Sequence, residues 1–122
     1  MGKKILIADD SSVIQTLTKK ILISLDYEVI GVKSGSKVMD MVDKNDFDII
    51  LMDINLPGTN GMELTKQIRA LNSKKAKTPI VAISGNYQNY SKEEFVAAGI
   101  NEHLVKPLNY DALVETVKKY AD

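Results

Sequence analysis

The chain has 122 residues, 44% of them hydrophobic and 26% charged, and 16 basic residues balance 16 acidic ones. This composition suits a single domain with a hydrophobic core and excludes a disordered tail, and the zero net charge argues against a nucleic-acid-binding surface. The lack of cysteine excludes disulfides and thiolate zinc sites. No apolar run reaches the ~20 residues of a membrane span or resembles a signal peptide, so we expect a cytoplasmic protein.

Five short apolar runs predict five β-strands. They cover residues 4–8, 27–32, 47–52, 79–84 and 102–106. The first, third and fourth runs are almost continuous Ile, Leu and Val. Such runs are typical of parallel strands that helices cover on both faces.

The first helical pattern covers residues 12–25. Its apolar residues fall on one stripe, which is expected to face the core: Ile14, Leu17, Ile21 and Leu25. Ser12 followed by Gln15 is typical of a helix start. A second helical pattern, over residues 36–44, carries the apolar residues Val38, Met39, Met41 and Val42.

The third and the last helices each follow an asparagine that can cap them. Asn60, with Glu63 three residues later, predicts one helix start. Asn109 can cap the last helix. The expected inward residues are Leu64, Ile68 and Leu71 in the third helix, and Leu113, Val117 and Tyr120 in the last.

The fourth helix has the most explicit start signal. Ser91 with Glu94 predicts a capping box, and Tyr90 and Phe95 are placed as a hydrophobic staple. The segment before this helix, residues 85–90, is the longest stretch without a predicted element. We expect a mobile functional loop there.

The alternation of strands and helices predicts one domain, residues 1–122, with an open parallel sheet and helices on both faces. In such sheets ligands bind outside the carboxyl ends of the strands. The polar residues that follow or end the predicted strands are Asp9, Asp10, Asp53, Ser84 and Lys106. We expect them to meet at one edge of the sheet.

Three of these side chains are carboxylates, which repel each other in a cleft unless a cation lies between them. An all-oxygen site with no cysteine or histidine beside it suits Mg²⁺ rather than Zn²⁺. Asp53 stands alone in its loop and could act as a nucleophile toward phosphorus. Ser84 and Lys106 could then contact the phosphoryl oxygens, so the set predicts phosphoryl transfer.

Each of these residues also has a purely structural explanation. Asp9 or Asp10 could be only an N-cap of the first helix, and Asp53 could be a turn residue. Ser84 could be an ordinary strand-end serine, and Lys106 a solvated lysine. The functional interpretation depends on the convergence of all five at one edge.

Four segments resemble the receiver domain of two-component response regulators, and in particular the single-domain chemotaxis-type regulators. They are LIADDS (6–11), DIILMDINLPGTNGMEL (48–64), TPIVAISG (78–85) and HLVKPL (103–108). The resemblance covers essentially the whole chain. It implies a flavodoxin-like, three-layer α/β/α fold: a doubly wound parallel sheet of five strands in the order 2-1-3-4-5, with five helices.

The resemblance also implies the roles of the carboxylates. Asp53 is the expected phosphoacceptor, which takes a phosphoryl group from a histidine kinase or a histidine phosphotransfer protein. Asp9, Asp10 and Asp53 are the expected ligands of Mg²⁺, or of Mn²⁺ in its place. The backbone carbonyl of Asn55 is expected to supply a further ligand.

On the other side of the site, Lys106 is expected to pair with the phosphoryl group, and Ser84 is the expected switch hydroxyl. The Lys106–Pro107 bond is expected to be cis, and Asn86 flanks the site where the family varies its dephosphorylation rate. The chain departs from the family at His103, where Tyr or Phe is common. We favour an exposed strand residue there; the alternative is a substitute switch ring whose charge changes near neutral pH.

The implied function is a signalling switch that assists its own phosphorylation and dephosphorylation and is not an enzyme acting on other substrates. Phosphorylation would shift an existing equilibrium in the loop 85–90 and the fourth helix. The expected output surface is the fourth helix, the fifth strand and the fifth helix, around residues 91–120, where a target or output domain binds. A monomer and a phosphorylation-dependent dimer both remain open, as do a stand-alone regulator and a domain of a hybrid kinase.

Three other functions deserve comparison. A flavodoxin-like electron carrier would need a glycine-containing phosphate loop after the first strand, but the segment ADDSS is acidic. A magnesium-dependent phosphatase would need a substrate cap, for which the chain has little room. A pseudo-receiver, which binds proteins without being phosphorylated, is the alternative that the departure at His103 supports.

Overall fold

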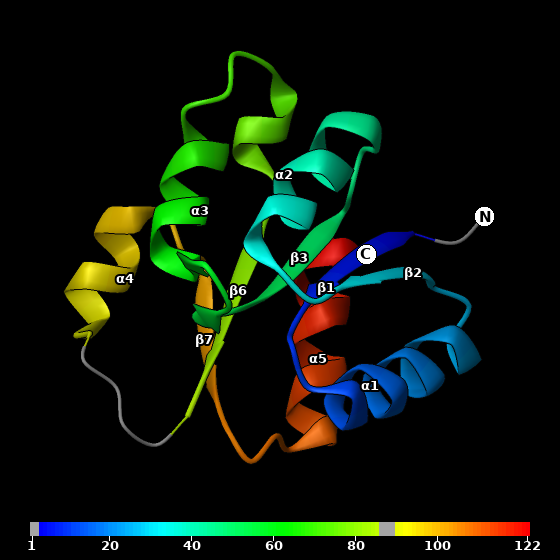
Figure 1. The fold of residues 1–122 in the computed structure, drawn as a ribbon. Helices are drawn as coiled ribbons and strands as arrows, with labels where there is room; N and C mark the ends of the chain where they lie inside the picture. The colour runs from blue at the N-terminus through cyan, green and yellow to red at the C-terminus, as the bar shows by residue number, and fades with distance from the viewer. Residues whose placement is uncertain (1–2, 86–89) are drawn as a thin grey trace.

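The main sheet consists of five parallel strands in the order β2-β1-β3-β6-β7 (Figure 1). A computed structural model describes residues 3–85 and 90–122 of the chain. Numbered along the chain without the β4–β5 hairpin, these strands have the order 2-1-3-4-5, so the flavodoxin-like prediction is confirmed. Their bounds are Lys4–Ala8 (β1), Glu28–Val32 (β2), Ile49–Asp53 (β3), Ile80–Ser84 (β6) and Glu102–Val105 (β7).

Five α-helices cover the two faces of the sheet. Their bounds are Ser12–Ser24 (α1), Gly35–Lys44 (α2), Gly61–Arg69 (α3), Lys92–Ala98 (α4) and Tyr110–Ala121 (α5). In Figure 1, α2, α3 and α4 lie on one side of the sheet, and α1 and α5 lie on the other. Within the described part of the chain, none of these helices combines the length and the hydrophobicity that crossing a membrane requires.

The sheet has a hydrophobic core on each face, and β3 shows how one strand serves both. All of its residues are buried. Ile50 and Met52 pack with the residues of α2, α3 and α4, whereas Ile49 and Leu51 pack with those of α1 and α5. Successive side chains of a strand point to opposite faces, so a continuous apolar run fills both cores, as predicted.

A short hairpin and a 3₁₀ turn were not predicted. The hairpin joins β4 (Asn55–Leu56) to β5 (Thr59–Asn60), and the 3₁₀ turn η1 covers Lys74–Lys77. Gly58 in the hairpin turn has φ +79°, which suits a residue without Cβ after a proline in a type II turn. Strands of two residues are too short for a period in the sequence to reveal them.

The caps of the later helices lie where the sequence predicts them, but the cap of α1 does not. Asn60 and Asn109 cap α3 and α5, and Ser91 and Glu94 form the reciprocal capping box of α4. The N-cap of α1 is Ser11 rather than Ser12. Its hydroxyl accepts a hydrogen bond from the Ile14 N–H at 3.3 Å.

The buried face of α1 is also different from the predicted stripe. Leu17 and Leu25 are 45% and 40% exposed, whereas the buried residues are Gln15, Thr18 and Leu22. A polar residue can occupy this face because the Gln15 amide finds backbone carbonyl partners inside. The helix is therefore rotated relative to the orientation that its apolar residues alone predict.

Arg69, the last residue of α3, ties three segments together. Its guanidinium donates to the carbonyls of Ala76 and Thr78 at 2.7 and 2.8 Å. It also donates to the Gly99 carbonyl at the end of α4, at 3.1 and 2.8 Å, and to Asn101 Oδ1 at 2.9 Å. The end of α4 is therefore fixed to α3 by a planar donor group.

The rotation of α1 predicts unequal effects for two leucines on the same helix. Leu22→Ala should lower the free energy of unfolding by about 2–5 kcal/mol, because it opens a cavity in the core. Leu17→Ala, the matched control, should change it by only about 0.5 kcal/mol, as is usual for surface substitutions. Urea unfolding followed by circular dichroism measures both, and equal losses would contradict the observed helix face.

Candidate functional site

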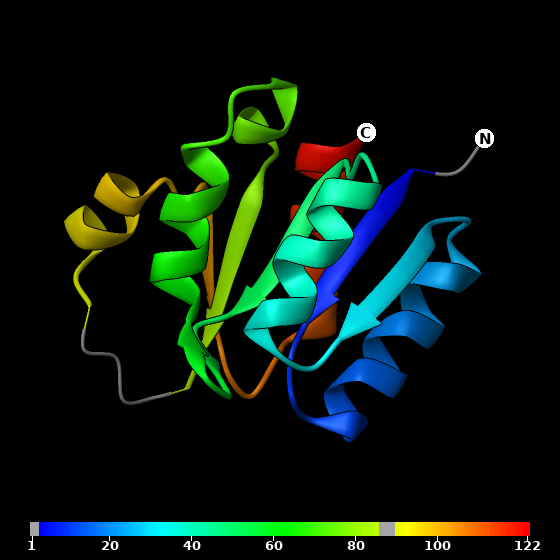
Figure 2. The same cartoon turned by 45° about the horizontal axis from the view of Figure 1, so that its top comes forward.

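Three carboxylates converge at the edge of the sheet toward which the strand arrowheads point in Figure 2. Asp9 and Asp10 follow β1, and Asp53 ends β3. One carboxylate oxygen of each lies within 4.8 Å of those of the other two. Asp9 and Asp53 are buried, at 1% and 3% exposure, whereas Asp10 is exposed. The structure thus brings the three acidic residues together, as the predicted topology requires.

Lys106 supplies the positive charge of this cluster. Its Nζ lies 2.9 Å from Asp53 Oδ2 and 3.3 Å from Asp9 Oδ2. The residue follows β7, and its peptide bond to Pro107 is cis, as expected. Its backbone N–H donates to the Ser84 carbonyl at 2.7 Å, which fixes the start of this segment beside β6.

Burial and neighbouring charges shift the pKa values of two members of the cluster. Burial raises the pKa of Asp9, and the negative charge of Asp53 adds to this, against the Ser11 N–H and the charge of Lys106. For Lys106, burial acts to lower the pKa, but the ion pairs with Asp53 and Asp9 outweigh it and raise the pKa. The ammonium of Lys106 therefore stays charged at neutral pH, while burial disfavours the ionised form of Asp9.

The donor set fits a hard divalent cation. Asp9 Oδ2 is buried, and within the described part of the chain its polar contact is the ion pair with Lys106 at 3.3 Å. Asp9, Asp10 and Asp53 each bring one carboxylate oxygen to this cluster, and carboxylate oxygens are ligands that Mg²⁺ prefers. A cation there would satisfy the orphan oxygen and remove the repulsion among the carboxylates.

The segment after Asp53 holds the carboxylate from its other side. The Asn55 N–H donates to Asp53 Oδ1 at 2.9 Å, so the main chain of Asn55 lies against the predicted phosphoacceptor. A Cβ on Gly61 would lie 2.8 Å from the Asp53 carbonyl oxygen. The glycine is therefore needed for the start of α3 to approach this loop so closely.

Ser84 reaches the same edge, but its hydroxyl points to another partner. Ser84 is 5% exposed and ends β6, and its Oγ lies 2.9 Å from His103 Nε2. The imidazole of His103 stacks on the ring of Phe95, with centroids 4.6 Å apart and an angle of 21°. The favoured prediction of an exposed residue at His103 is thus wrong, because the ring is half-buried between a hydroxyl and an aromatic side chain.

Two predictions cannot be followed at this edge. Asn86 and most of the predicted loop 85–90 lie outside the described residues. Ser84 and Gly85 before them, and Tyr90 after them, are described.

Gln15 is a site residue that sequence reasoning missed. Its buried Nε2 donates to the Asp9 carbonyl at 2.9 Å and to the Val32 carbonyl at 2.6 Å. It therefore joins the ends of β1 and β2 and holds the backbone of Asp9. A Cβ on Gly31 would lie 2.0 Å from Gln15 Oε1, so the neighbouring strand leaves room for this side chain. The available signal was the spacing of Gln15, Thr18 and Leu22, which places the glutamine on one face with a core leucine.

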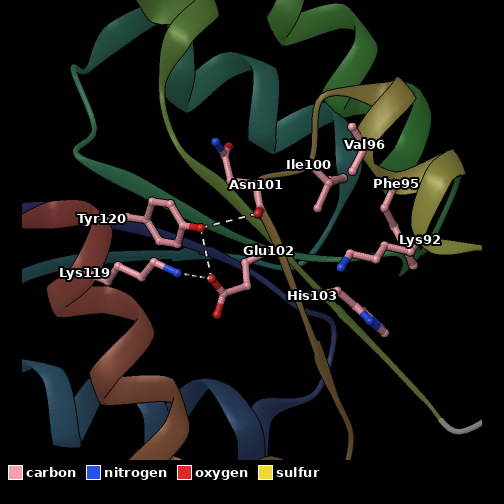
Figure 3. A pocket seen from close by; sticks show the side chains of 9 residues that line it. All are labelled: Lys92, Phe95, Val96, Ile100, Asn101, Glu102, His103, Lys119 and Tyr120. Atoms are coloured by element: carbon pink, nitrogen blue, oxygen red, sulfur yellow. Dashed lines mark hydrogen bonds and ion pairs between the residues drawn. The ribbon is translucent and has the colours of Figure 1, made fainter.

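A pocket of about 580 Å³ lies between α4, β7 and α5, away from the carboxylates (Figure 3). His103 and Phe95 line its α4 side. On the α5 side, Glu102 accepts hydrogen bonds from Lys119 at 3.1 Å and from the Tyr120 hydroxyl at 2.9 Å. The imidazole of His103, which is hydrogen-bonded to Ser84, thus also contributes to the surface predicted for partner binding.

Comparison with known proteins agrees with this geometry. The family model of the response regulator receiver domain matches residues 5–118. The hybrid signal transduction histidine kinase F of Dictyostelium discoideum is 34% identical over 98% of this chain, which spans only 11% of that kinase. The polar-differentiation response regulator DivK of Brucella ovis is 28% identical, with 98% of this chain and 97% of that protein covered.

Among solved structures, the chain is similar to the receiver domain of the sensor histidine kinase PA1611 from Pseudomonas aeruginosa. The TM-score is 0.87 at 31% identity, and the match covers 99% of this chain and 98% of the other. That receiver domain was solved with a magnesium ion coordinated in its active site cleft. With the family model covering nearly the whole chain, and with its fold and acidic cluster in place, the protein belongs to the response regulator receiver domain family of two-component systems.

Proposed function

We propose that this receiver domain is a phosphorylation-dependent signalling switch with Asp53 as its phosphoacceptor. The observation that carries the proposal is the ion pair of Asp53 with Lys106 beside two further carboxylates. An Asp53 oxygen forms the new O–P bond while the N–P bond of a phosphohistidine donor breaks, and the electron pair stays on the histidine nitrogen. The donor is a histidine kinase or a histidine phosphotransfer protein.

The residues around Asp53 prepare this transfer. Asp9, Asp10 and Asp53, with the backbone carbonyl of Asn55, hold Mg²⁺ in this proposal, and Mn²⁺ is the alternative ion. When bound, the ion neutralises phosphoryl oxygens and so favours attack by a carboxylate. The Asn55 N–H and the Lys106 ammonium already contact the two Asp53 oxygens, so the nucleophile is held in one orientation. After the transfer, Lys106 pairs with a phosphoryl oxygen.

Partners recognise the phosphorylated state through the surface made by α4, β7 and α5. The Ser84 hydroxyl contacts His103 on β7, and Lys106 directly follows β7. A change at Asp53 that moves Ser84 or Lys106 would therefore also move residues of this surface. A downstream target or output domain binds there, and the 580 Å³ pocket lies in the middle of it. In this role the chain assists its own phosphorylation and dephosphorylation and acts on no other substrate. It works in the cytoplasm, as a monomer or as a phosphorylation-dependent dimer.

Labelling by a small phosphodonor tests the phosphoacceptor. Acetyl phosphate with Mg²⁺ should add one phosphoryl mass to the intact protein, and Asp53→Asn should abolish the addition, because the amide is not a nucleophile toward phosphorus. Asp40→Asn, which removes an exposed carboxylate on α2, is the matched control and should label like the unmodified chain. Intact-mass spectrometry measures all three.

Two results would contradict this assignment. Equal labelling of Asp53→Asn would move the phosphoacceptor elsewhere. No labelling of the unmodified chain, by acetyl phosphate or by a phosphohistidine donor, would favour a pseudo-receiver that binds its partners without phosphorylation.

Replacing Asp10 tests the proposed metal site. Asp10→Asn should weaken Mg²⁺ binding at least about tenfold, the order of loss that even an outer-shell partner causes. Because Asp10 is exposed, the metal-free fold should be as stable as before. Isothermal titration calorimetry measures the affinity, with Asp111→Asn, an exposed carboxylate at the start of α5, as the control. An unchanged Kd in Asp10→Asn would place the metal site elsewhere.

A further inference from the structure

Either Ser84 or His103 can be the donor of the hydrogen bond between them, depending on which ring nitrogen carries the proton. Ser84 Oγ and His103 Nε2 are 2.9 Å apart, and the hydroxyl is buried. Within residues 3–85 and 90–122 the structure gives this hydroxyl no other hydrogen-bond partner. A serine hydroxyl carries a single proton, and a neutral imidazole carries one proton on either nitrogen. Since the described residues offer no other acceptor, the hydroxyl can donate only to Nε2, which must then be unprotonated.

Phosphorylation changes what Ser84 must do. The oxygens of a phosphoryl group at neutral pH act as acceptors, so Ser84 can serve one of them only by donating its single proton. The contact with His103 then survives only if Nε2 carries a proton and donates to the serine oxygen. The single proton of the Ser84 hydroxyl thus links the phosphorylation of Asp53 to the position of the proton on the His103 ring.

The packing of His103 keeps the ring beside Ser84. It stacks on Phe95, which is 4% exposed. Phe95 in turn contacts the ring of Tyr90 at 5.9 Å, and the Tyr90 hydroxyl accepts a hydrogen bond from Asn60 Nδ2 at 2.6 Å. Because this aromatic row holds the ring in its plane, moving a proton between its nitrogens disturbs less packing than turning the ring away.

Burial supports the neutral form of the ring that this exchange requires. Desolvation lowers the pKa of His103 below its usual value, so the imidazole is neutral at and above neutral pH. The charged groups that line the same pocket are Lys92 on α4, Glu102 on β7 and Lys119 on α5, and the last two are paired with each other.

We propose that phosphorylation of Asp53 reverses the Ser84–His103 hydrogen bond, so that His103 becomes the donor that positions the switch hydroxyl. The Ser84 proton turns from Nε2 to a phosphoryl oxygen, while the ring releases its Nδ1 proton to solvent and takes up a proton from solvent at Nε2. The ring gains no net proton. This inference rests on the proposed function, and it assigns His103 as a positioning residue. A phenylalanine at this position could keep the stacking but not the hydrogen bond.

The chain offers an unusually direct test because His103 is its only histidine. In untagged, ¹⁵N-labelled protein at about pH 8, well above the usual histidine pKa of about 6.5, the imidazole gives one pair of ¹⁵N signals. We expect an unprotonated Nε2 in the free protein. With Mg²⁺ and beryllofluoride, a stable phosphoryl mimic, Nε2 should carry the proton and Nδ1 should lose it. The backbone amide of Asn55 reports independently that the Asp53 adduct has formed.

Ser84→Ala is the matched control because it removes the hydroxyl and leaves the charge of the adduct unchanged. In this variant the ring nitrogens should not exchange their protonation when beryllofluoride binds. An exchange in Ser84→Ala would overturn the proposal, since charge alone would then explain it. So would an adduct on the unmodified chain with the same tautomer in both states. Failure of the Asn55 amide to report any adduct would instead overturn the proposed function, and the reversal with it.

Discussion

The excess of negative over positive side chains at the carboxyl edge of the sheet is the constraint on which the site depends. Three carboxylates meet there, and Lys106 contacts two of them. Burying Asp9 and Asp53 costs free energy, and the ion pairs with the single ammonium of Lys106 offset only part of it, because Asp9 Oδ2 still lacks a hydrogen-bond partner within the described part of the chain. Such costs are common at functional sites, and an excess of carboxylates over ammonium groups favours the binding of a cation at this edge.

The rest of the fold supports this edge from both sides. The buried strands β1, β3 and β6 form a rigid frame between two hydrophobic cores. Hydrogen bonds from Gln15, Asn55 and Ser11 then fix the backbone or the carboxylates of the acidic residues. Because these donors come from the start of α1 and from β4, secondary structure fixes the positions of Asp9 and Asp53.

Much of this arrangement could be predicted from the sequence, and the reasons are physical. Continuous Ile, Leu and Val runs identify strands buried on both faces, and parallel order then places Asp9, Asp53, Ser84 and Lys106 at one edge. The face of α1 could not be predicted, because Gln15 is buried through bonds to distant carbonyls that periodicity does not contain. The environment of His103 depends on the pairing of β6 with β7, which joins residues about 20 positions apart.

The attachment of Arg69 has a mechanical consequence for α4. The C-terminal end of this helix is held by bonds from one guanidinium to Gly99 and Asn101, whereas the hydrogen bond from Asn60 to Tyr90 links the opposite end to α3. The described residues give the C-terminal end more of these hydrogen bonds than the N-terminal end, so a tilt of α4 would pivot near Gly99. Its seven residues span about 10 Å, so a tilt of about 10° moves the N-terminal end by about 2 Å. Phe95, in the middle of the helix, is the residue on which the ring of His103 stacks.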